Sequence, residues 1–512
     1  MKNNQEDKVN LKLWISSPIK FYLNSKYPQV EGFVDVILSD LIEYIKQSEN
    51  VKRVHKNKIK SSLEIALLNL YSAHLSNPKK YVAYPRGNNK YSKDGSRYKR
   101  QDIGYDTFVK RVINSLRDLG YIEDHTGFYD KEFRYGMNSR MRASSKLSKL
   151  FTEHKLAGVM VGRDTSEEVI VLKDSSIDEH YRKTKSIIEY EDTEMTNQMR
   201  ENLHNINYLL DSQYIDLEVS DKVLKKINKK LSKKKNKEMV DFTRKKLKRI
   251  FNNSSFENGG RFYHGWWQEI PKEYRDFIRI NDKKTTEVDY SSIHPRILYA
   301  KEGIDLGNTD PYIIEGYEDD RDTIKVALNI ILNAETKDKA ISAIYKHDDI
   351  DIDKKTAQDI YQKLEDAHPM IQKYFGSGEG VRLQYIDAQM AEKVMLNLAK
   401  YNIVALPVHD SFIVRSSHRV DLLEEMDKAF EEVVGIKPKR DIKGLKLGKK
   451  VAIKEAERFY GDIGEWLYDE EGNLEGIIIK ASSTYELINK RDKEYQGYHL
   501  RRGEWIEHKG YI

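Results

Sequence analysis

Two aspartates stand where strand-like runs of the sequence end. Asp289 follows the run KKTTEV and comes directly before residues that can start a helix. Asp410 lies between the apolar runs IVALPV and FIV, which together are typical of a β-hairpin. Burying a carboxylate between two core strands is costly unless a cation compensates its charge. The pattern therefore predicts that Asp410 is buried and that it binds a metal ion together with Asp289.

Two carboxylates on neighbouring strands can share a pair of divalent ions, which is the arrangement that transfers a nucleotidyl group from a nucleoside triphosphate. One ion lowers the pKa of an attacking 3′-hydroxyl, and the other neutralises the leaving pyrophosphate. Two Mg²⁺ ions are expected because Mg²⁺ is hard and prefers oxygen ligands, and Mn²⁺ could replace them. Taken singly, each aspartate is unremarkable, and an HD dipeptide by itself is more typical of an aspartate that caps a turn.

A third element could supply cations for the triphosphate. The segment RDTIKVALNIILNA follows an acidic loop, which is a typical helix start. Four polar side chains recur at four-residue spacing and therefore share one helix face: Arg321, Lys325, Asn329 and Asn333. Cations one turn apart can clamp a triphosphate, with lysine as a point charge and arginine as a fork. A surface helix with salt bridges is the alternative.

The order of these motifs resembles that of the family A DNA polymerases and the related phage-type single-subunit RNA polymerases. GR, QxIP, DYSxI, RxxxK and HD occur in this order between about residues 259 and 415. The resemblance implies an α+β right-hand fold with an antiparallel β palm, helical fingers and a helical thumb. It also implies that the protein extends a nucleic-acid strand, with DNA primer–template and nucleoside triphosphates as partners.

The resemblance assigns roles residue by residue. Asp289 and Asp410 become the metal ligands, and Tyr290 adds a backbone carbonyl. Arg321 and Lys325 bind the triphosphate, with Asn329, Asn333 and His294 also near the nucleotide. Residues expected to contact nucleic acid are Arg261, Gln268, Arg296, Gln384, Gln389 and His409, with Lys229 and Lys233 in a lysine-rich segment. Gln384 and Gln389 fit the same role equally well.

Three departures from the family pattern leave the sugar open. His294 stands where the DNA polymerases have a glutamate under C2′ of the sugar, and Asn333 stands where they have a tyrosine. Ser411 follows the second aspartate, as in the RNA polymerases. DNA-templated DNA synthesis is the leading hypothesis. The alternatives are a polymerase or primase that accepts ribonucleotides, and a non-catalytic DNA-binding replication initiator.

The lysine-rich segment 221–251 precedes the motifs. Its apolar residues recur at helical intervals, which predicts a basic amphipathic helix pair. Clustered cations on one surface favour phosphate binding through counterion release, although a solvated helix face has the same composition. In the family such helices form the thumb, which grips duplex phosphates.

The remaining chain divides into regions by pattern. Residues 1–100 are expected to form a helical N-terminal region, and 101–155 resemble a winged-helix module, with helix, glycine turn and hairpin in order. A purely structural role suits that module equally well. Residues 156–258 are expected to be a connector with the thumb-like helices, 259–460 the palm and fingers, and 461–512 an extension of two strands and a helix.

Composition excludes several classes of protein. The 512 residues include no cysteine, which removes disulfides, thiolate metal sites and cysteine nucleophiles. The net charge of +6 is too small to identify a partner. No leader and no run of about 18 apolar residues is visible, so we expect a cytoplasmic protein that is not membrane-bound. Protein partners are not predicted.

Overall fold

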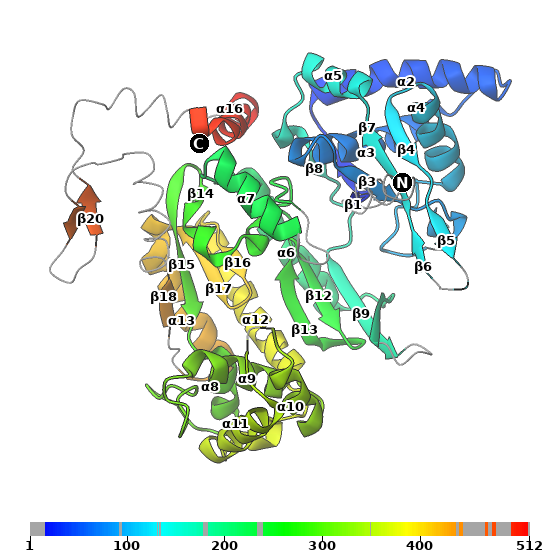
Figure 1. Cartoon of the computed structure of the whole chain (residues 1–512). Coiled ribbons are helices and arrows are strands. Elements are labelled where there is room, and N and C mark those ends of the chain that lie inside the picture. Colours follow the sequence, from blue (N-terminus) through cyan, green and yellow to red (C-terminus); the bar gives the residue numbers. More distant parts are fainter. Residues whose placement is uncertain are drawn as a thin grey trace, which may run out of the picture.

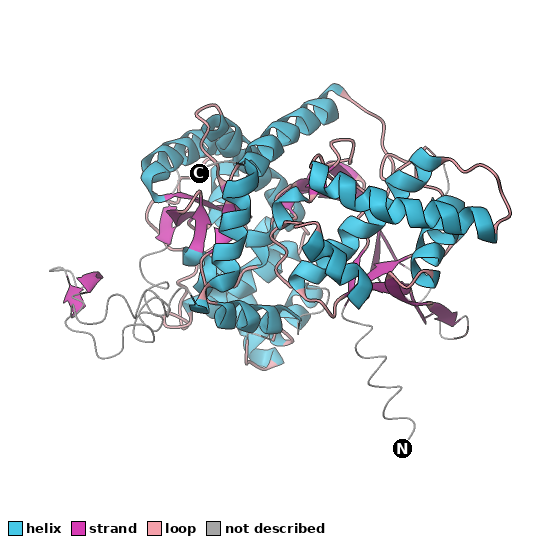
Figure 2. Cartoon of the chain, turned by 90° about the horizontal axis from the view of Figure 1, so that it is seen from above, coloured by secondary structure: helices cyan, strands magenta, loops and turns pink. Residues whose placement is uncertain are grey.

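The computed structural model describes residues 16–91, 95–130, 132, 135–177, 183–232, 239–348, 350–436, 440–443, 466–468, 474–477 and 493–509. Within these residues, the apolar side chains form two large hydrophobic cores, one between residues 23 and 161 and the other between 169 and 430. In Figure 1 the part of the chain that holds the first core is blue to cyan, and the part that holds the second runs from green to orange. Helices dominate, and the strands form separate groups among them (Figure 2).

The first core is built around two long helices. α2 (Pro28–Ser48) and α3 (Lys56–Ser76) carry the apolar periodicity seen in the sequence and bury it. The helical prediction is confirmed for both. The elements that complete this part are β1 (Ser16–Pro18), β2 (Leu23–Asn24), β3 (Tyr81–Tyr84), η1 (Asn88–Tyr91), η2 (Asp106–Ile113), α4 (Asn114–Asp118), β4 (Ile122–His125), β5 (Phe128–Asp130), β6 (Tyr135–Met137), β7 (Ser139–Ala143), α5 (Ser145–Glu153), η3 (Gly158–Met160) and β8 (Gly162–Arg163).

The helix–hairpin order predicted between residues 101 and 155 is present. η2 and α4 run from Asp106 to Asp118, and Gly120 turns the chain with a φ of 75°. β4 then pairs antiparallel with β7, and the β5–β6 hairpin lies between them in sequence. These elements share the core of α2 and α3. DNA binding by this module stays a prediction.

Two sheets belong to the second core. The smaller has the strand order β10–β9–β12–β13, from β9 (Ile170–Ile177), β10 (Lys183–Ile187), β12 (Lys248–Asn252) and β13 (Ser255–Tyr263). The larger, called the central sheet below, has the order β11–β14–β15–β17–β16, with β18 also paired to β15. Its strands are β11 (Ile215–Leu217), β14 (Ile278–Ile280), β15 (Lys283–Tyr290), β16 (Leu406–Val408), β17 (Ser411–Arg415) and β18 (Arg440–Lys443).

Every pairing within the central sheet is antiparallel. The sequence prediction of an antiparallel sheet around the two aspartates is therefore confirmed. The elements packed around both sheets are α6 (Glu194–Ser212), η4 (Trp266–Glu269), η5 (Lys272–Phe277), α8 (Ile293–Lys301), α9 (Arg321–Asn333), α10 (Lys337–Tyr345), α11 (Lys354–Ala367), η6 (Gln372–Tyr374), α12 (Gly380–Ala399), η7 (Ser416–His418) and α13 (Arg419–Val434). In Figure 1, α8 to α11 gather at one end of this sheet.

The predicted basic helix pair is wrong in its second half. α7 (Asp221–Ser232) is the first helix, and it buries Val223, Ile227 and Leu231 as expected. Residues 248–252 instead form strand β12, in which Arg249 and Phe251 are buried between partly exposed neighbours. This alternation has the period of a strand, and the lysines around it hid that period from a helical interpretation.

The C-terminal strands and helix are present as predicted. β19 (Trp466–Tyr468) pairs antiparallel with β20 (Leu474–Ile477), and α16 (Gln496–Lys509) follows. Tyr498 and Trp505 of α16 join a small aromatic cluster with Tyr214. None of the helices in the described part of the chain combines the length and apolar character needed to cross a bilayer.

Candidate active site

The central sheet brings Asp289 and Asp410 together. Asp289 is the penultimate residue of β15 and pairs with Ser411, the first residue of β17. β16 and β17 are joined by a two-residue turn, His409 and Asp410, because Val408 pairs directly with Ser411. The backbone N–H of Tyr290 donates to the Asp410 carbonyl at 3.3 Å. The hairpin turn therefore lies against the end of β15, with the two carboxylates on adjoining residues.

The two acids differ in exposure. Asp289 is 7% exposed, whereas Asp410 is only half-buried, so the prediction of a buried Asp410 is wrong. The reason is that Asp410 belongs to the turn itself, while the apolar runs on either side are the buried strands. Two non-glycine residues beside the acids, Ser292 and His409, have left-handed φ values of 52° and 60°. Such strained residues are concentrated at functional sites.

The donor set suits a hard cation. Asp289 and Asp410 stand on neighbouring parts of the paired strands and carry the oxygen ligands that Mg²⁺ prefers. No group of three or more histidine, aspartate or glutamate side chains with metal-binding geometry occurs in the described ranges. Mg²⁺ is often held by one or two carboxylates together with substrate phosphates and water, so Asp289 and Asp410 fit this mode of binding.

Glu287 lies on the same strand as Asp289 and is 5% exposed. Its carboxylate accepts hydrogen bonds from Arg275 at 2.9 Å and from the Ser411 hydroxyl at 2.6 Å. Because a cation already compensates it, Glu287 serves to fix Ser411, and thereby the turn that carries Asp410. Sequence reasoning missed Glu287, although its two-residue spacing from Asp289 on a strand was a usable signal.

A buried tyrosine links the acids to α9. Tyr312 is 3% exposed, and its ring lies 5.2 Å from the Arg321 guanidinium and 5.8 Å from the Lys325 ammonium. Burial raises the pKa of the Tyr312 hydroxyl to about 12; a hydrogen bond with Ser292 opposes this rise, and the Asp410 charge adds to it. Tyr312 thus lies within electrostatic reach of Asp410 on one side and packs against both cations of α9 on the other.

The polar face of α9 forms as the four-residue spacing predicted. Arg321 donates to Asp310 at 2.7 Å, and this hydrogen bond raises the pKa of Arg321. Lys325 is exposed, and no carboxylate of the described residues lies within ion-pair distance of it. Asn329 is half-buried. The Asn333 amide donates to the Asn329 carbonyl at 2.8 Å.

Arg261 and His294, both half-buried, meet the buried Asp387 in a polar cluster beside the acids. The Asp387 carboxylate is fully buried on α12 and accepts hydrogen bonds from Arg261 of β13, one of them at 2.9 Å. His294 Nε2 lies 3.0 Å from the same carboxylate and 3.3 Å from Arg261. Burial would raise the pKa of Asp387, but the hydrogen bonds from His294 and Arg261 lower it below its usual range.

This cluster reaches the candidate metal ligands. Burial opposes the positive charge of Arg261, but Asp387 and then Asp410 raise the pKa of that guanidinium. Desolvation by the surrounding protein and the charge of Arg261 lower the pKa of His409, which Asp410 partly offsets. Sequence reasoning missed Asp387. The available signal was an acid on the apolar face of α12, four residues after Leu383 and three before Met390.

The other predicted residues have varied surroundings. The Gln268 amide donates to the carbonyls of Phe262 and Pro407, which ties η4 to β16. Arg296 is 2% exposed and donates to Gly307 at 2.9 Å. Gln384 and Gln389 are both half-buried on α12, and Gln389 donates to Tyr385 at 2.5 Å.

The lysine face of α7 is exposed. Lys229 lies on this face with Lys222, Lys225 and Lys226, while Lys230 pairs with Glu273 at 2.8 Å. Lys233 lies outside the described residues. Contact of these lysines with nucleic acid stays a prediction.

Comparison with known proteins gives a distant structural match. No family model and no curated protein matches the chain. A solved structure, the POL domain of Pol1 from M. smegmatis in complex with a DNA primer–template and dNTP, matches with a TM-score of 0.30 and 10% identity. The match covers 80% of this chain and 65% of that one, so this chain spans less than two thirds of the matched domain.

Proposed function

We propose that this protein is a nucleic-acid polymerase that extends a primer 3′ end by two-metal-ion nucleotidyl transfer, with DNA-templated DNA synthesis as its activity. The observation that supports the proposal is the contact between the β15 terminus and the β16–β17 turn, in which Asp289 pairs with Ser411 and the Tyr290 N–H donates to the Asp410 carbonyl. Tyr312, which hydrogen-bonds Ser292 near these acids, also packs its ring against Arg321 and Lys325, two cations on one face of α9.

The residues have distinct roles in this proposal. Asp289 and Asp410 would hold Mg²⁺, which when bound lowers the pKa of the attacking hydroxyl and neutralises charge on the phosphates. Lys325, which has no carboxylate partner among the described residues, binds the triphosphate of the incoming nucleotide. Arg321 adds a second cation, and its ion pair with Asp310 holds the guanidinium in place before the nucleotide arrives.

The nucleic acid would meet cations from several elements. His409 is exposed on the turn beside Asp410, where a primer terminus would lie. The exposed lysines of α7, Lys229 among them, would contact backbone phosphates. Such contacts favour binding because they release the counterions condensed on the phosphates.

A ribonucleotide-accepting polymerase or primase is the second candidate. His294 is held by Asp387 and Arg261 on the motif that carries Asp289, in the position where the resembling DNA polymerases have their sugar-selecting glutamate. An imidazole fixed in this way can accept or donate a hydrogen bond to a 2′-hydroxyl. Extension with dNTPs and with rNTPs in separate reactions therefore distinguishes the two candidates.

The test is primer extension with Mg²⁺ on a DNA template, with dNTPs and rNTPs in separate reactions. Wild-type protein should extend the primer, whereas Asp289→Asn and Asp410→Asn should each reduce extension to background. Asp338→Asn, an exposed acid in the first turn of α10, serves as the matched control and should extend as wild type does. Faster extension with rNTPs would select the second candidate.

Absence of metal-dependent incorporation by wild-type protein with either set of nucleotides would refute both polymerase assignments. If the same protein still bound DNA, the non-catalytic initiator would be the remaining hypothesis. Equal extension by Asp410→Asn and wild type would refute the assignment of the metal site alone.

A further inference from the structure

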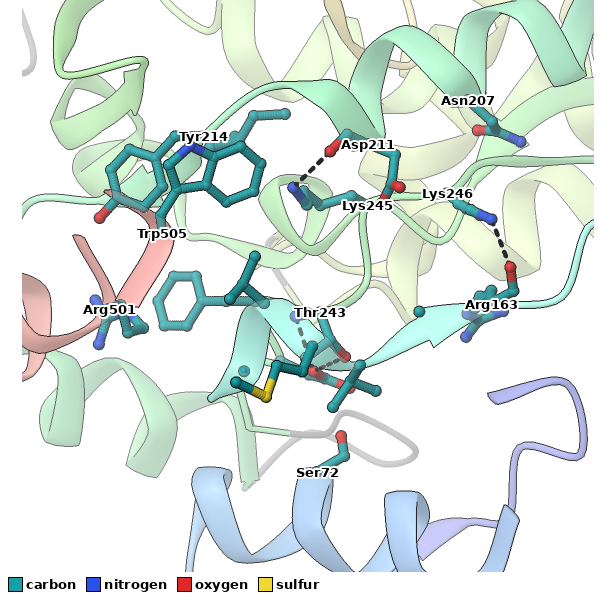
Figure 3. A pocket seen from close by; sticks show the side chains of 18 of the residues that line it. Ser72, Arg163, Asn207, Asp211, Tyr214, Thr243, Lys245, Lys246, Arg501 and Trp505 are labelled. Carbon is teal, nitrogen blue, oxygen red and sulfur yellow. Dashed lines mark hydrogen bonds between the residues drawn. The ribbon is translucent and has the colours of Figure 1, made fainter. Parts of the chain in front are cut away.

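A large cavity lies away from the candidate active site. Its volume is about 950 Å³, and its wall comes from α3, β8, α6, the segment 240–248 and α16. No residue of the Asp289–Asp410 site or of α9 lines it. Figure 3 shows the lysines of the segment 240–248 on one side and the aromatic pair of Tyr214 and Trp505 beside them.

Two lysines of this wall make hydrogen bonds only to backbone carbonyls among the described residues. The Lys245 ammonium donates to the Gln213 carbonyl at 2.9 Å and lies 4.4 Å from the centre of the Trp505 ring. The Lys246 ammonium donates to the Arg163 carbonyl at 2.9 Å. No carboxylate of the described chain lies within ion-pair distance of either ammonium, so both positive charges lack an ion-pair partner there.

Most carboxylates of the same wall form ion pairs with cations other than Lys245 and Lys246. Asp216 binds Arg501 through two hydrogen bonds of 2.7 Å each. Asp241 pairs with Lys20 at 2.6 Å, and Glu167 pairs with both Arg163 and Lys248. Burial lowers the pKa of Lys245 to about 8, and the nearby Asp211 offsets this only in part. An anion in the cavity would supply the missing countercharge.

Apolar side chains line the cavity and remain open to contact. Tyr208 is 79% exposed, Leu500 is 64% exposed and Leu75 is 46% exposed, although each contributes to the wall. Large exposed apolar groups gathered around one concavity mark a binding site more often than a free surface. The combination calls for a ligand that has a flat apolar part and a negatively charged part.

We propose that this cavity is a binding site for a nucleoside phosphate, separate from the candidate active site. The phosphate would lie against Lys245 and Lys246, and the base would stack on Tyr208 beside the apolar wall. A volume of about 950 Å³ falls within the range of roughly 300–1,000 Å³ that small-molecule sites occupy. The ligand could be a free nucleotide or the phosphorylated end of a single strand, which present the same chemistry.

Isothermal titration calorimetry on the full chain without Mg²⁺ tests this site. The probes are thymidine 5′-monophosphate, thymidine, inorganic phosphate and a 5′-phosphorylated thymidine hexanucleotide. Thymidine monophosphate should bind more tightly than thymidine or phosphate alone, because each of these lacks half of the contacts. Comparison with the hexanucleotide distinguishes a free nucleotide from a strand end.

Lys245→Met and Lys246→Met should each weaken binding by roughly tenfold or more, as expected for loss of a charge-assisted contact to phosphate. Lys149→Met, an exposed lysine on α5 outside the cavity, is the matched control and should bind as wild type does. Tyr208→Ala provides a variant on an exposed surface in case the lysine variants unfold, and it should weaken thymidine monophosphate but not inorganic phosphate.

Two results would overturn the proposal. One is the absence of binding of every probe to wild-type protein. The other is equal affinity for thymidine monophosphate in wild type and in folded Lys245→Met, Lys246→Met and Tyr208→Ala variants. Neither result bears on primer extension, so the outcome is independent of the proposed polymerase activity.

Discussion

At the scale of single residues, Asp387 is the group on which the charges around the candidate active site depend. Its carboxylate is fully buried and meets two cationic or potentially cationic partners, Arg261 and His294. Breaking a buried pair by removing one partner is strongly destabilising, because the other charge stays buried without compensation. Neutralising Asp387 therefore affects both folding and the position of His294.

We predict that Asp387→Asn lowers the free energy of unfolding by about 3 kcal/mol at neutral pH, the lower end of the cost of breaking a buried pair. The difference from wild type should depend on pH. A carboxyl whose pKa is lowered on folding contributes stability above its unfolded pKa of about 4, and that contribution is lost as the pH falls through the lower, folded value. Urea denaturation at a series of pH values from neutral down to below the unfolded pKa measures this dependence.

The matched control is Asp366→Asn, an exposed acid on α11. It should change the unfolding free energy little at any of these pH values. A constant difference between Asp387→Asn and wild type across the whole pH range would contradict an ionised Asp387.

Single residues also show which parts of the candidate site could be predicted from the sequence and which could not. Asp289 and Asp410 could be found because each stands at the end of a locally recognisable run of strand residues. Asp387 could not be paired with its partners, because 126 residues separate it from Arg261 and 93 from His294. Local periodicity carries no information about which distant side chains meet.

At the scale of elements, α9 has the clearest division between a buried and an open face. Ile324, Leu328 and Ile331 are fully buried, while Lys325 is exposed. Because its buried face holds the helix in place, the open face can be altered without unfolding it. The sequence predicted both faces, since the helical period is visible without any tertiary contact.

We predict that Lys325→Ala raises the KM for the incoming nucleoside triphosphate by about tenfold to a hundredfold, the range expected when one charge-assisted contact to phosphate is lost. The melting temperature should stay as in wild type, because Lys325 is exposed and unpaired among the described residues. Steady-state primer extension gives the KM, and a thermal melt checks the fold. Lys339→Ala on α10, an exposed lysine paired with Glu335, is the control.

Equal KM values for Lys325→Ala and wild type would remove α9 from the nucleotide site. A higher KM accompanied by a lower melting temperature would instead assign Lys325 a structural role.

β12 illustrates why an element can be misread. Its segment is rich in lysine and arginine, yet Arg249 is fully buried and donates to Glu392 of α12 at 2.8 Å. An arginine in a sequence is taken for a surface residue, because arginine is rarely buried without a partner. Only the contact with α12, 143 residues away, makes the strand's inward face compatible with a charge.

We predict that Glu392→Ala lowers the free energy of unfolding by about 3–5 kcal/mol, since it leaves the Arg249 guanidinium buried without a counterion. The double variant Arg249→Met with Glu392→Leu should recover most of this loss, because apolar residues of similar volume can replace a buried ion pair. Chemical denaturation of wild type, the single variant and the double variant measures how much of the lost stability is recovered. A double variant that is less stable than Glu392→Ala would contradict this account.

At the scale of the whole molecule, contacts between remote parts of the chain join the two cores. Lys20 of the first part pairs with Asp241 of the second at 2.6 Å. The C-terminal helix α16 lies against the edge of the central sheet, where Arg501 binds Asp216 of β11 and Arg502 pairs with Asp282. Gly158 also donates to Glu504 of α16 at 3.2 Å, so this helix touches both parts.

The sequence predicted α16 as a helix but not its place. Its residues Tyr498 and Trp505 are buried against Tyr214, which lies in the first half of the chain. The basic and aromatic composition of this segment did not indicate a partner, because a contact between residues so far apart leaves no local pattern. In the structure, the aromatic side chains of α16 pack against Tyr214, and its two arginines form ion pairs with Asp216 and Asp282.

Two adjacent arginines of α16 allow a matched comparison of buried and exposed ion pairs. We predict that Arg501→Ala lowers the free energy of unfolding by about 3–5 kcal/mol, because Asp216 is 2% exposed and would be left as an uncompensated buried carboxylate. Arg502→Ala should cost about 1 kcal/mol or less, because the Arg502 side chain is 43% exposed and water screens its pair with Asp282. Urea denaturation of both variants measures the two costs.

Hydrogen exchange followed by mass spectrometry locates the loss. In Arg501→Ala, amide protection should fall in α16 and in β11, while α2 and α3 of the first core keep theirs, because no hydrogen bond or ion pair among the described residues joins them to Arg501 or Asp216. Arg502→Ala should leave the exchange pattern close to that of wild type. Equal costs for the two variants would mean that the depth of the ion pair does not determine how firmly α16 is held against the central sheet.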